Sequence, residues 1–127
     1  MQATYRAIRK CLAAGDHLLY RYRANPEEGA FAICSFWEAE YLALGGGNSD
    51  ECRQLMKILF NYRNDLGLYG EEIDVNTGAA LGNFPQAFTH IGLIGAALSL
   101  DQRVKGEQQQ AHRAKSVPVW TQAAQGS

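Results

Sequence analysis

The chain has 127 residues, a normal length for one small domain, and its 12 basic and 13 acidic side chains give a net charge of −1. So balanced a charge gives no electrostatic reason to bind nucleic acid or an anionic membrane. We find neither a signal-peptide pattern nor the roughly 20 consecutive apolar residues that span a bilayer. The three cysteines, Cys11, Cys34 and Cys52, form no closely spaced pair, which predicts reduced thiols in a cytoplasmic protein. The histidines are far apart, and we expect no metal site and no cofactor.

Two helices are predicted in the first half of the chain. The first covers residues 2–14, where Tyr5, Ile8 and Leu12 recur at helical spacing and basic side chains lie elsewhere. This pattern is typical of an amphipathic helix with one wet face. The second covers residues 29–44 and is apolar around nearly its whole circumference, which indicates a buried helix.

Two further helices repeat this alternation. The third covers residues 49–65 and carries one apolar stripe. The fourth covers residues 84–100, with Asn83 as a capping residue and Pro85 in its first turn. It is again apolar on all sides. Residues 102–127 are polar, so we expect one domain over residues 1–101 followed by a disordered tail.

The alternation of amphipathic and buried helices predicts an all-α fold with two concentric layers. Outer helices show one face to water, and inner helices are enclosed on both sides. We expect the helices at residues 29–44 and 84–100 to pack side by side, and we expect no sheet of three or more strands. Four helices are too few to enclose two inner ones. The pattern therefore indicates part of a larger all-α fold.

The acidic residues gather in the two loops that lead from an outer to an inner helix, residues 15–28 and 66–83. In a double layer these loops lie at the same end. They contain Glu27, Glu28, Glu71, Glu72 and Asp74, with several aromatic residues close by. Carboxylates supply acid–base chemistry and bind hydroxyl groups, and aromatic rings pack on sugars, so the pattern favours a carbohydrate site. The alternative is a solvated turn at 71–72 and a favourable helix dipole at 27–28.

Several segments resemble bacterial members of glycoside hydrolase family 15. They are residues 28–37 (EGAFAICSFW), 70–74 (GEEID), 77–78 (TG) and 81–90 (LGNFPQAFTH). The resemblance runs from about residue 3 to residue 100. It implies that the four helices are the last third of an (α/α)6 barrel. It also implies hydrolysis of terminal α-glucosidic bonds with inversion, as in glucoamylases, glucodextranases and trehalases, so that the partner is an α-glucoside or oligosaccharide.

The resemblance also implies roles for individual residues. Glu71 matches the catalytic general base, and Glu72 follows it as a substrate-binding residue. Glu28 and Phe31 line the glucose pocket at the start of an inner helix. Trp37 is expected in the core, and His90 is expected to be a hydrogen-bonded core histidine.

No motif in the chain matches the general acid of the family, which lies earlier in the barrel. We therefore expect the isolated chain to be inactive, and its exposed apolar faces to allow self-association. The alternative function is a non-catalytic helical interaction module. Against it, no repeat of a helix pair is visible, and such a module has no use for adjacent acids in a long loop.

Overall fold

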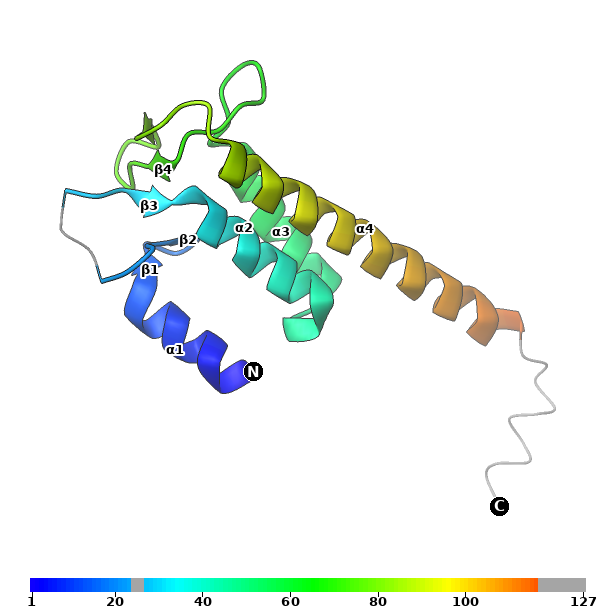
Figure 1. Cartoon of the computed structure of the whole chain (residues 1–127). Coiled ribbons are helices and arrows are strands. Elements are labelled where there is room, and N and C mark those ends of the chain that lie inside the picture. The colour runs from blue at the N-terminus through cyan, green and yellow to red at the C-terminus, as the bar shows by residue number, and fades with distance from the viewer. Residues whose placement is uncertain (24–26, 117–127) are drawn as a thin grey trace.

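The computed structural model describes residues 1–23 and 27–116, and within them the fold is built from helices (Figure 1). The helices are α1 (Gln2–Leu12), α2 (Ala32–Tyr41), a π-helical turn η1 (Leu42–Gly46), α3 (Ser49–Phe60) and α4 (Ala87–Ser116). The predicted all-α class with four main helices is confirmed. Figure 1 shows α2, α3 and α4 packed together, α1 at one side, and the end of α4 projecting beyond the body.

The start of α3 follows directly from the local sequence. Asn48 caps the helix: its side chain accepts a hydrogen bond from the Glu51 backbone N–H, and the Glu51 carboxylate accepts one from the Asn48 N–H. The helix ends at Phe60, five residues before the predicted end. There the Asn64 side chain accepts hydrogen bonds from the N–H groups of Leu66 and Leu68, which closes a turn instead of continuing the helix.

The two buried helices of the prediction, α2 and α4, lie side by side as expected (Figure 1). Gly92 allows their close approach. A Cβ atom at Gly92 would lie 2.9 Å from Ile33 Cγ1 and 3.2 Å from Phe36 Cβ, so a larger residue would push the helices apart. Phe36 and Tyr69 pack edge to face with ring centroids 5.2 Å apart, in a core that also contains Cys52 and Leu59.

Short strands fasten the loops. β1 (Ala13–Ala14) pairs with β2 (Leu18–Leu19), and β3 (Ala30–Phe31), β4 (Glu72–Ile73) and β5 (Ala80–Leu81) form an antiparallel sheet in that order. The expectation of no three-stranded sheet is therefore wrong. Each strand has only two residues, too short for a hydrophobic alternation to reveal it in the sequence.

Helix α4 differs from its predicted range at both ends. It begins at Ala87 and not at residue 84, and it continues to Ser116, through much of the segment predicted to be disordered. The first part of this extension is held by contacts of Arg103 and Glu107. Arg103 donates to the carbonyl oxygens of Ala43 (3.1 Å) and Gly47 (3.4 Å), and Glu107 Oε2 accepts from the Ser49 hydroxyl (2.7 Å). Residues 117–127 lie outside the described part of the chain, and a domain boundary at residue 101 stays a prediction.

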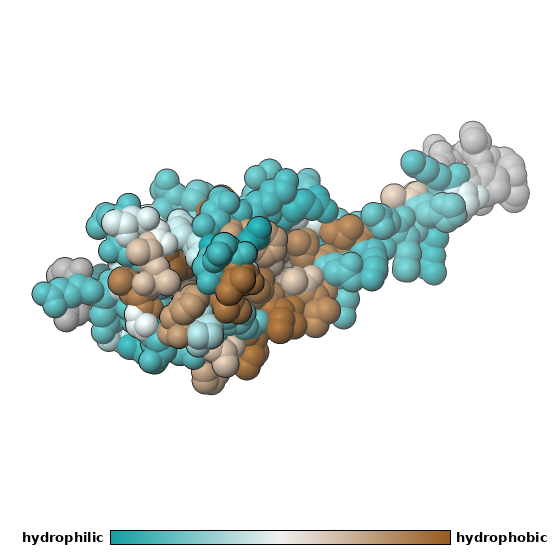
Figure 2. Space-filling model, turned by 90° about the horizontal axis from the view of Figure 1, so that it is seen from above, coloured by the Kyte–Doolittle hydropathy of each residue, from teal (hydrophilic) through white to brown (hydrophobic). Residues whose placement is uncertain are grey.

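One face of α4 is apolar and open to solvent. Phe88, Ile91, Ile94 and Leu98 are each more than half exposed. Figure 2 shows apolar surface gathered on the body of the molecule, whereas the projecting end of α4 is hydrophilic.

Trp37 on α2 is 52% exposed, which corrects its predicted place in the core. None of the described helices is both long and apolar enough to cross a membrane.

Candidate active site

The two acidic loops meet at one end of the molecule, as the sequence predicts. The pairing of β3 with β4 sets Phe31 opposite Glu72. The Ala32 N–H, at the start of α2, donates to the Glu71 carbonyl oxygen at 3.0 Å. Gly29 permits this approach, because a Cβ atom there would lie 2.6 Å from the Ile73 carbonyl oxygen.

Glu71 has one anchored carboxylate oxygen. Its Oε2 accepts hydrogen bonds from the backbone N–H of Asn83 (3.1 Å) and from the Asn83 side-chain amide (2.9 Å). Gly82 makes room for this contact: it has φ +70°, and a Cβ atom there would lie 2.9 Å from the same Oε2. Among the described residues, none donates a hydrogen bond to the other oxygen, Oε1. The carboxylate is thus oriented by one oxygen and available to a water through the other.

Glu72, the neighbour of Glu71, makes a different contact. Its Oε2 accepts a hydrogen bond from the Gly29 N–H at 3.3 Å, which ties β4 to the approach to β3. The predicted general base and its neighbour are therefore not interchangeable: Asn83 orients the first, and the second helps to join the two loops.

Glu28 and Phe31 lie close to a residue that the sequence analysis did not single out, Arg21. The Tyr22 hydroxyl donates to Glu28 Oε1 at 2.6 Å. The Arg21 guanidinium lies 4.7 Å from the centre of the Phe31 ring and 4.9 Å from that of Tyr22. The pKa of Arg21 is raised, first by its hydrogen bond to Tyr22 and further by the charges of Glu28 and Glu72. Its position between two tyrosines, Tyr20 and Tyr22, was the available signal.

Asp74 serves the loop rather than the open site. Its Oδ1 accepts hydrogen bonds from the N–H groups of Asn76 (2.8 Å) and Thr77 (2.9 Å). These bonds favour the ionised form and lower the pKa of the carboxyl group. Asp74 therefore closes the turn that leads to β5.

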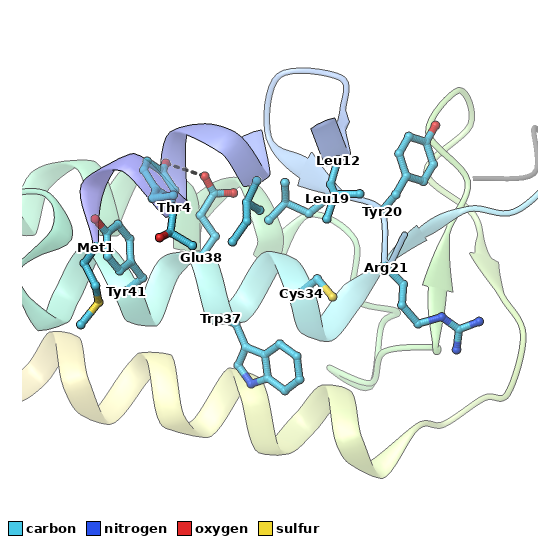
Figure 3. Close-up of a pocket in the computed structure, with 12 residues that line it drawn as sticks. Met1, Thr4, Leu12, Leu19, Tyr20, Arg21, Cys34, Trp37, Glu38 and Tyr41 are labelled. Carbon is cyan, nitrogen blue, oxygen red and sulfur yellow. Dashed lines mark hydrogen bonds between the residues drawn. The ribbon is translucent and has the colours of Figure 1, made fainter. Parts of the chain in front are cut away.

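A separate groove of about 340 Å³ lies between α1, β2 and α2 (Figure 3). It is mainly apolar and includes Ile8, Leu12, Cys34 and Trp37, with Arg21 at one end. It contains neither Glu71 nor Glu72. We therefore place the candidate active site at the two loops and not in this groove. In the described residues, no three His, Cys, Asp or Glu side chains come together as metal ligands would.

One end of this helical fold thus holds an oriented but accessible carboxylate, together with further acids, an arginine and aromatic rings. Carbohydrate-cleaving enzymes use sites of this kind. Comparison with known proteins agrees with this class. Residues 49–98 match the model of the family described as glycosyl hydrolases family 15. By this match and the relatives below, the chain resembles the family 15 glycosyl hydrolases.

Three relatives show the extent of the similarity. The trehalase of Mycolicibacterium smegmatis is 43% identical over 90 residues, 65% of this chain and 13% of that protein. The trehalase of Thermoplasma volcanium is 38% identical over 103 residues, 78% of this chain and 16% of that protein. Trehalase 2 of Sulfolobus acidocaldarius is 32% identical over 103 residues, 78% of this chain and 18% of that protein. The chain thus matches less than a fifth of the length of each. No solved structure matches it significantly.

Proposed function

We propose that this chain supplies the general base of an inverting glycoside hydrolase that cleaves terminal α-glucosidic bonds, with trehalose as the substrate. In this proposal its helices form the last third of an (α/α)6 barrel. The observation that carries the proposal is the carboxylate of Glu71, held through Oε2 by two donors of Asn83 while Oε1 faces no donor in the described residues. The choice of trehalose rests on the relatives, whose names are trehalases.

The proposed reaction uses two carboxyl groups. Glu71 Oε1 takes a proton from a water molecule while the water oxygen attacks the anomeric carbon. A carboxylic acid from outside these 127 residues gives its proton to the departing glycosidic oxygen. In inverting enzymes the two groups stand roughly 6.5–9.5 Å apart, which leaves room for the water. Because the water enters on the face opposite the leaving group, the configuration at that carbon inverts.

The neighbouring residues bind the sugar in this proposal. Phe31 offers a ring face, and Glu28 and Glu72 offer acceptors to glucose hydroxyl groups. Arg21, which lies over Phe31, adds donors to the same region. We place the protein in the cytoplasm, in keeping with the free thiols of Cys11, Cys34 and Cys52. The alternative of a helical interaction module has no specific observation in its favour.

The test needs a complete catalytic domain. We suggest the trehalase of Mycolicibacterium smegmatis with its matching region replaced by the corresponding residues of this chain. In this chimera, Glu71→Gln should reduce kcat for trehalose by about 10²–10⁴-fold, because an amide cannot accept the proton of water. KM should change much less, since the base acts mainly in the transition state. Glu72→Gln should cost less than Glu71→Gln.

Two outcomes would contradict the proposal. If Glu72→Gln were the more damaging change, the base would be Glu72. If the first products, resolved by NMR before mutarotation, were α-glucose only, the reaction would retain configuration. Inversion predicts equal amounts of α- and β-glucose, because one glucose unit is attacked by water and the other leaves with its configuration unchanged.

A further inference from the structure

The Glu71 base lies in a loop, and loops are usually the mobile part of a fold. A catalytic group must nevertheless be held within about 0.5 Å of its working position. The structure contains a specific device for this purpose, made by the first turns of α4 and the segment before it. We call the hydrogen bonds from residues 83–90 to residues 69–71 the α4 clamp.

The α4 clamp engages the backbone of residues 69–71 at four points. The Tyr69 N–H donates to His90 Nε2 (3.3 Å), and the Tyr69 carbonyl oxygen accepts from the Gln86 N–H (3.0 Å). The Thr89 hydroxyl donates to the Gly70 carbonyl oxygen (3.0 Å), and the Glu71 N–H donates to the Asn83 carbonyl oxygen (2.9 Å). The segment that carries the base is thus bonded to α4 and its approach at each of three consecutive residues.

The partners of His90 define its protonation. Its Nδ1 lies 2.7 Å from the Gln86 carbonyl oxygen, which can only accept a hydrogen bond, so Nδ1 carries the proton. Its Nε2 accepts from the Tyr69 N–H and therefore carries no proton. His90 makes both bonds only as the neutral Nδ1–H tautomer.

The clamp is buried at its centre, around Tyr69, Gly70 and Thr89, where water cannot easily replace a lost hydrogen bond. Thr89 and Tyr69 are each 1% exposed, and Gly70 is buried. The Tyr69 ring is fixed as well, because its hydroxyl donates to the Leu59 carbonyl oxygen at 3.0 Å and the ring packs edge to face with that of His90. Losing one partner would leave a buried polar group unpaired and let the segment shift.

We propose that His90 and Thr89 are positioning residues for catalysis, which hold the backbone of residues 69–71 and thereby place the carboxylate of Glu71. The catalytic role of the clamp rests on the proposed function, whereas the hydrogen bonds of the clamp do not depend on it. A displacement near 1 Å costs about 10²-fold in rate, so breaking the clamp should be visible in kcat.

The kinetic test uses matched pairs in the chimera described above. Thr89→Val removes the hydroxyl at nearly constant shape, whereas Thr89→Ser keeps it. His90→Leu removes both nitrogens, whereas His90→Gln keeps an acceptor for the Tyr69 N–H. Ser99→Ala is the control on the same helix, since Ser99 bonds to Glu40 and not to the loop.

We expect Thr89→Val and His90→Leu to lower kcat by about 10–100-fold with KM within about 3-fold. Thr89→Ser, His90→Gln and Ser99→Ala should stay within about 3-fold of the parent in kcat. Equal losses in the two members of a pair would overturn the proposal. So would losses that simply follow the fall in Tm, because a merely structural role lowers stability without separating kcat from KM.

A second measurement tests the hydrogen bonds of the clamp directly and does not depend on enzyme activity. In the ¹⁵N-labelled 127-residue chain, long-range proton–nitrogen correlation should show Nδ1 of His90 protonated and Nε2 bare. The Tyr69 amide should exchange slowly with solvent, and faster in His90→Leu. A protonated Nε2 or a rapidly exchanging Tyr69 amide in the parent chain would overturn the clamp. By contrast, an active Glu71→Gln chimera, or a folded but inactive parent chimera, would overturn the proposed function and leave this second result standing.

Discussion

The carboxylate of Glu38 is buried and interacts with two side chains of α1, Tyr5 and Arg9. Its Oε1 accepts from the Tyr5 hydroxyl at 2.7 Å, and its Oε2 lies 3.3 Å from Arg9 Nη1. The Glu38 side chain is 6% exposed, so the pair is shielded from water, unlike an ordinary surface pair. These bonds fasten α1 to α2, because Tyr5 and Arg9 occupy the same face of α1.

Replacing Arg9 by Met should therefore destabilise the fold by about 1–3 kcal/mol, since it leaves a buried carboxylate with a single partner. Arg53→Met is the matched control. Arg53 pairs with Asp50 at 2.9 Å, but both side chains are well exposed, and such pairs contribute at most about 1 kcal/mol. Urea unfolding followed by circular dichroism measures both variants. Equal losses would mean that the burial of Glu38 has no energetic consequence.

Two of the six tyrosines should ionise late. Burial raises the pKa of Tyr69 to about 12. Burial, followed by the hydrogen bond to Glu38, raises the pKa of Tyr5 to about 12. In the unfolded chain a tyrosine ionises near pH 10, so the folded state holds these protons longer. Stability should be retained below pH 10 and should fall as the pH rises from 10 to 12. Tyrosinate absorbance measures this, and six tyrosines that ionise together would contradict it.

The residues of the site differ in how far the sequence could predict them. Glu71 and Glu72 were identified through the resemblance, and the strand pairing sets Glu72 opposite Phe31. The roles of these residues stay predictions. Arg21 was not predicted as a site residue because an arginine in a loop is usually solvated. Only the structure shows that its guanidinium lies over the rings of Tyr22 and Phe31. The prediction for Trp37 was wrong because it assumed that every side of an apolar helix is covered.

The helices likewise differ in how far the sequence could predict their ends. The helix starts were predictable where a local signal exists, as at the capping box of Asn48 and Glu51. The end of α4 was not. Polar composition after residue 101 indicated disorder, yet Arg103 reaches the carbonyl oxygens of Ala43 and Gly47, some 60 residues earlier in the chain. A long-range contact of this kind leaves no local pattern.

This contact leads to a truncation test of the boundary predicted at residue 101. A chain ending at residue 101 loses Arg103 and Glu107, which hold α4 against η1 and the start of α3. A chain ending at residue 110 keeps both. We expect the shorter chain to be less stable by about 1–3 kcal/mol and the longer one to match the full chain, because three buried or half-buried hydrogen bonds separate them. Urea unfolding decides the matter, and equal stability of the two truncations would favour the boundary at residue 101.

At the scale of the whole molecule, the most prominent surface feature is the apolar outer face of α4. Phe88, Ile91, Ile94 and Leu98 recur at helical spacing and are 56–64% exposed. A stable monomer rarely leaves so continuous an apolar stripe in water. If the chain is part of a barrel, further helices cover this stripe. Where those helices are absent, the stripe is free to associate with another copy.

The double variant Ile91→Glu, Leu98→Glu distinguishes a stripe that is exposed in the 127-residue chain from a stripe that other helices cover in a complete catalytic domain. In the 127-residue chain both side chains are exposed, so the variant should unfold within about 0.5 kcal/mol of the parent, bind less hydrophobic dye and sediment as a smaller species. In the trehalase chimera the same glutamates would be buried against neighbouring helices without partners, which should abolish folding or activity. Sedimentation velocity and dye fluorescence measure the first setting, and trehalose hydrolysis the second. A parent chain that sediments as a monomer without binding dye would contradict the open stripe. A fully active variant chimera would show that no further helix covers α4, and the barrel arrangement would then be wrong.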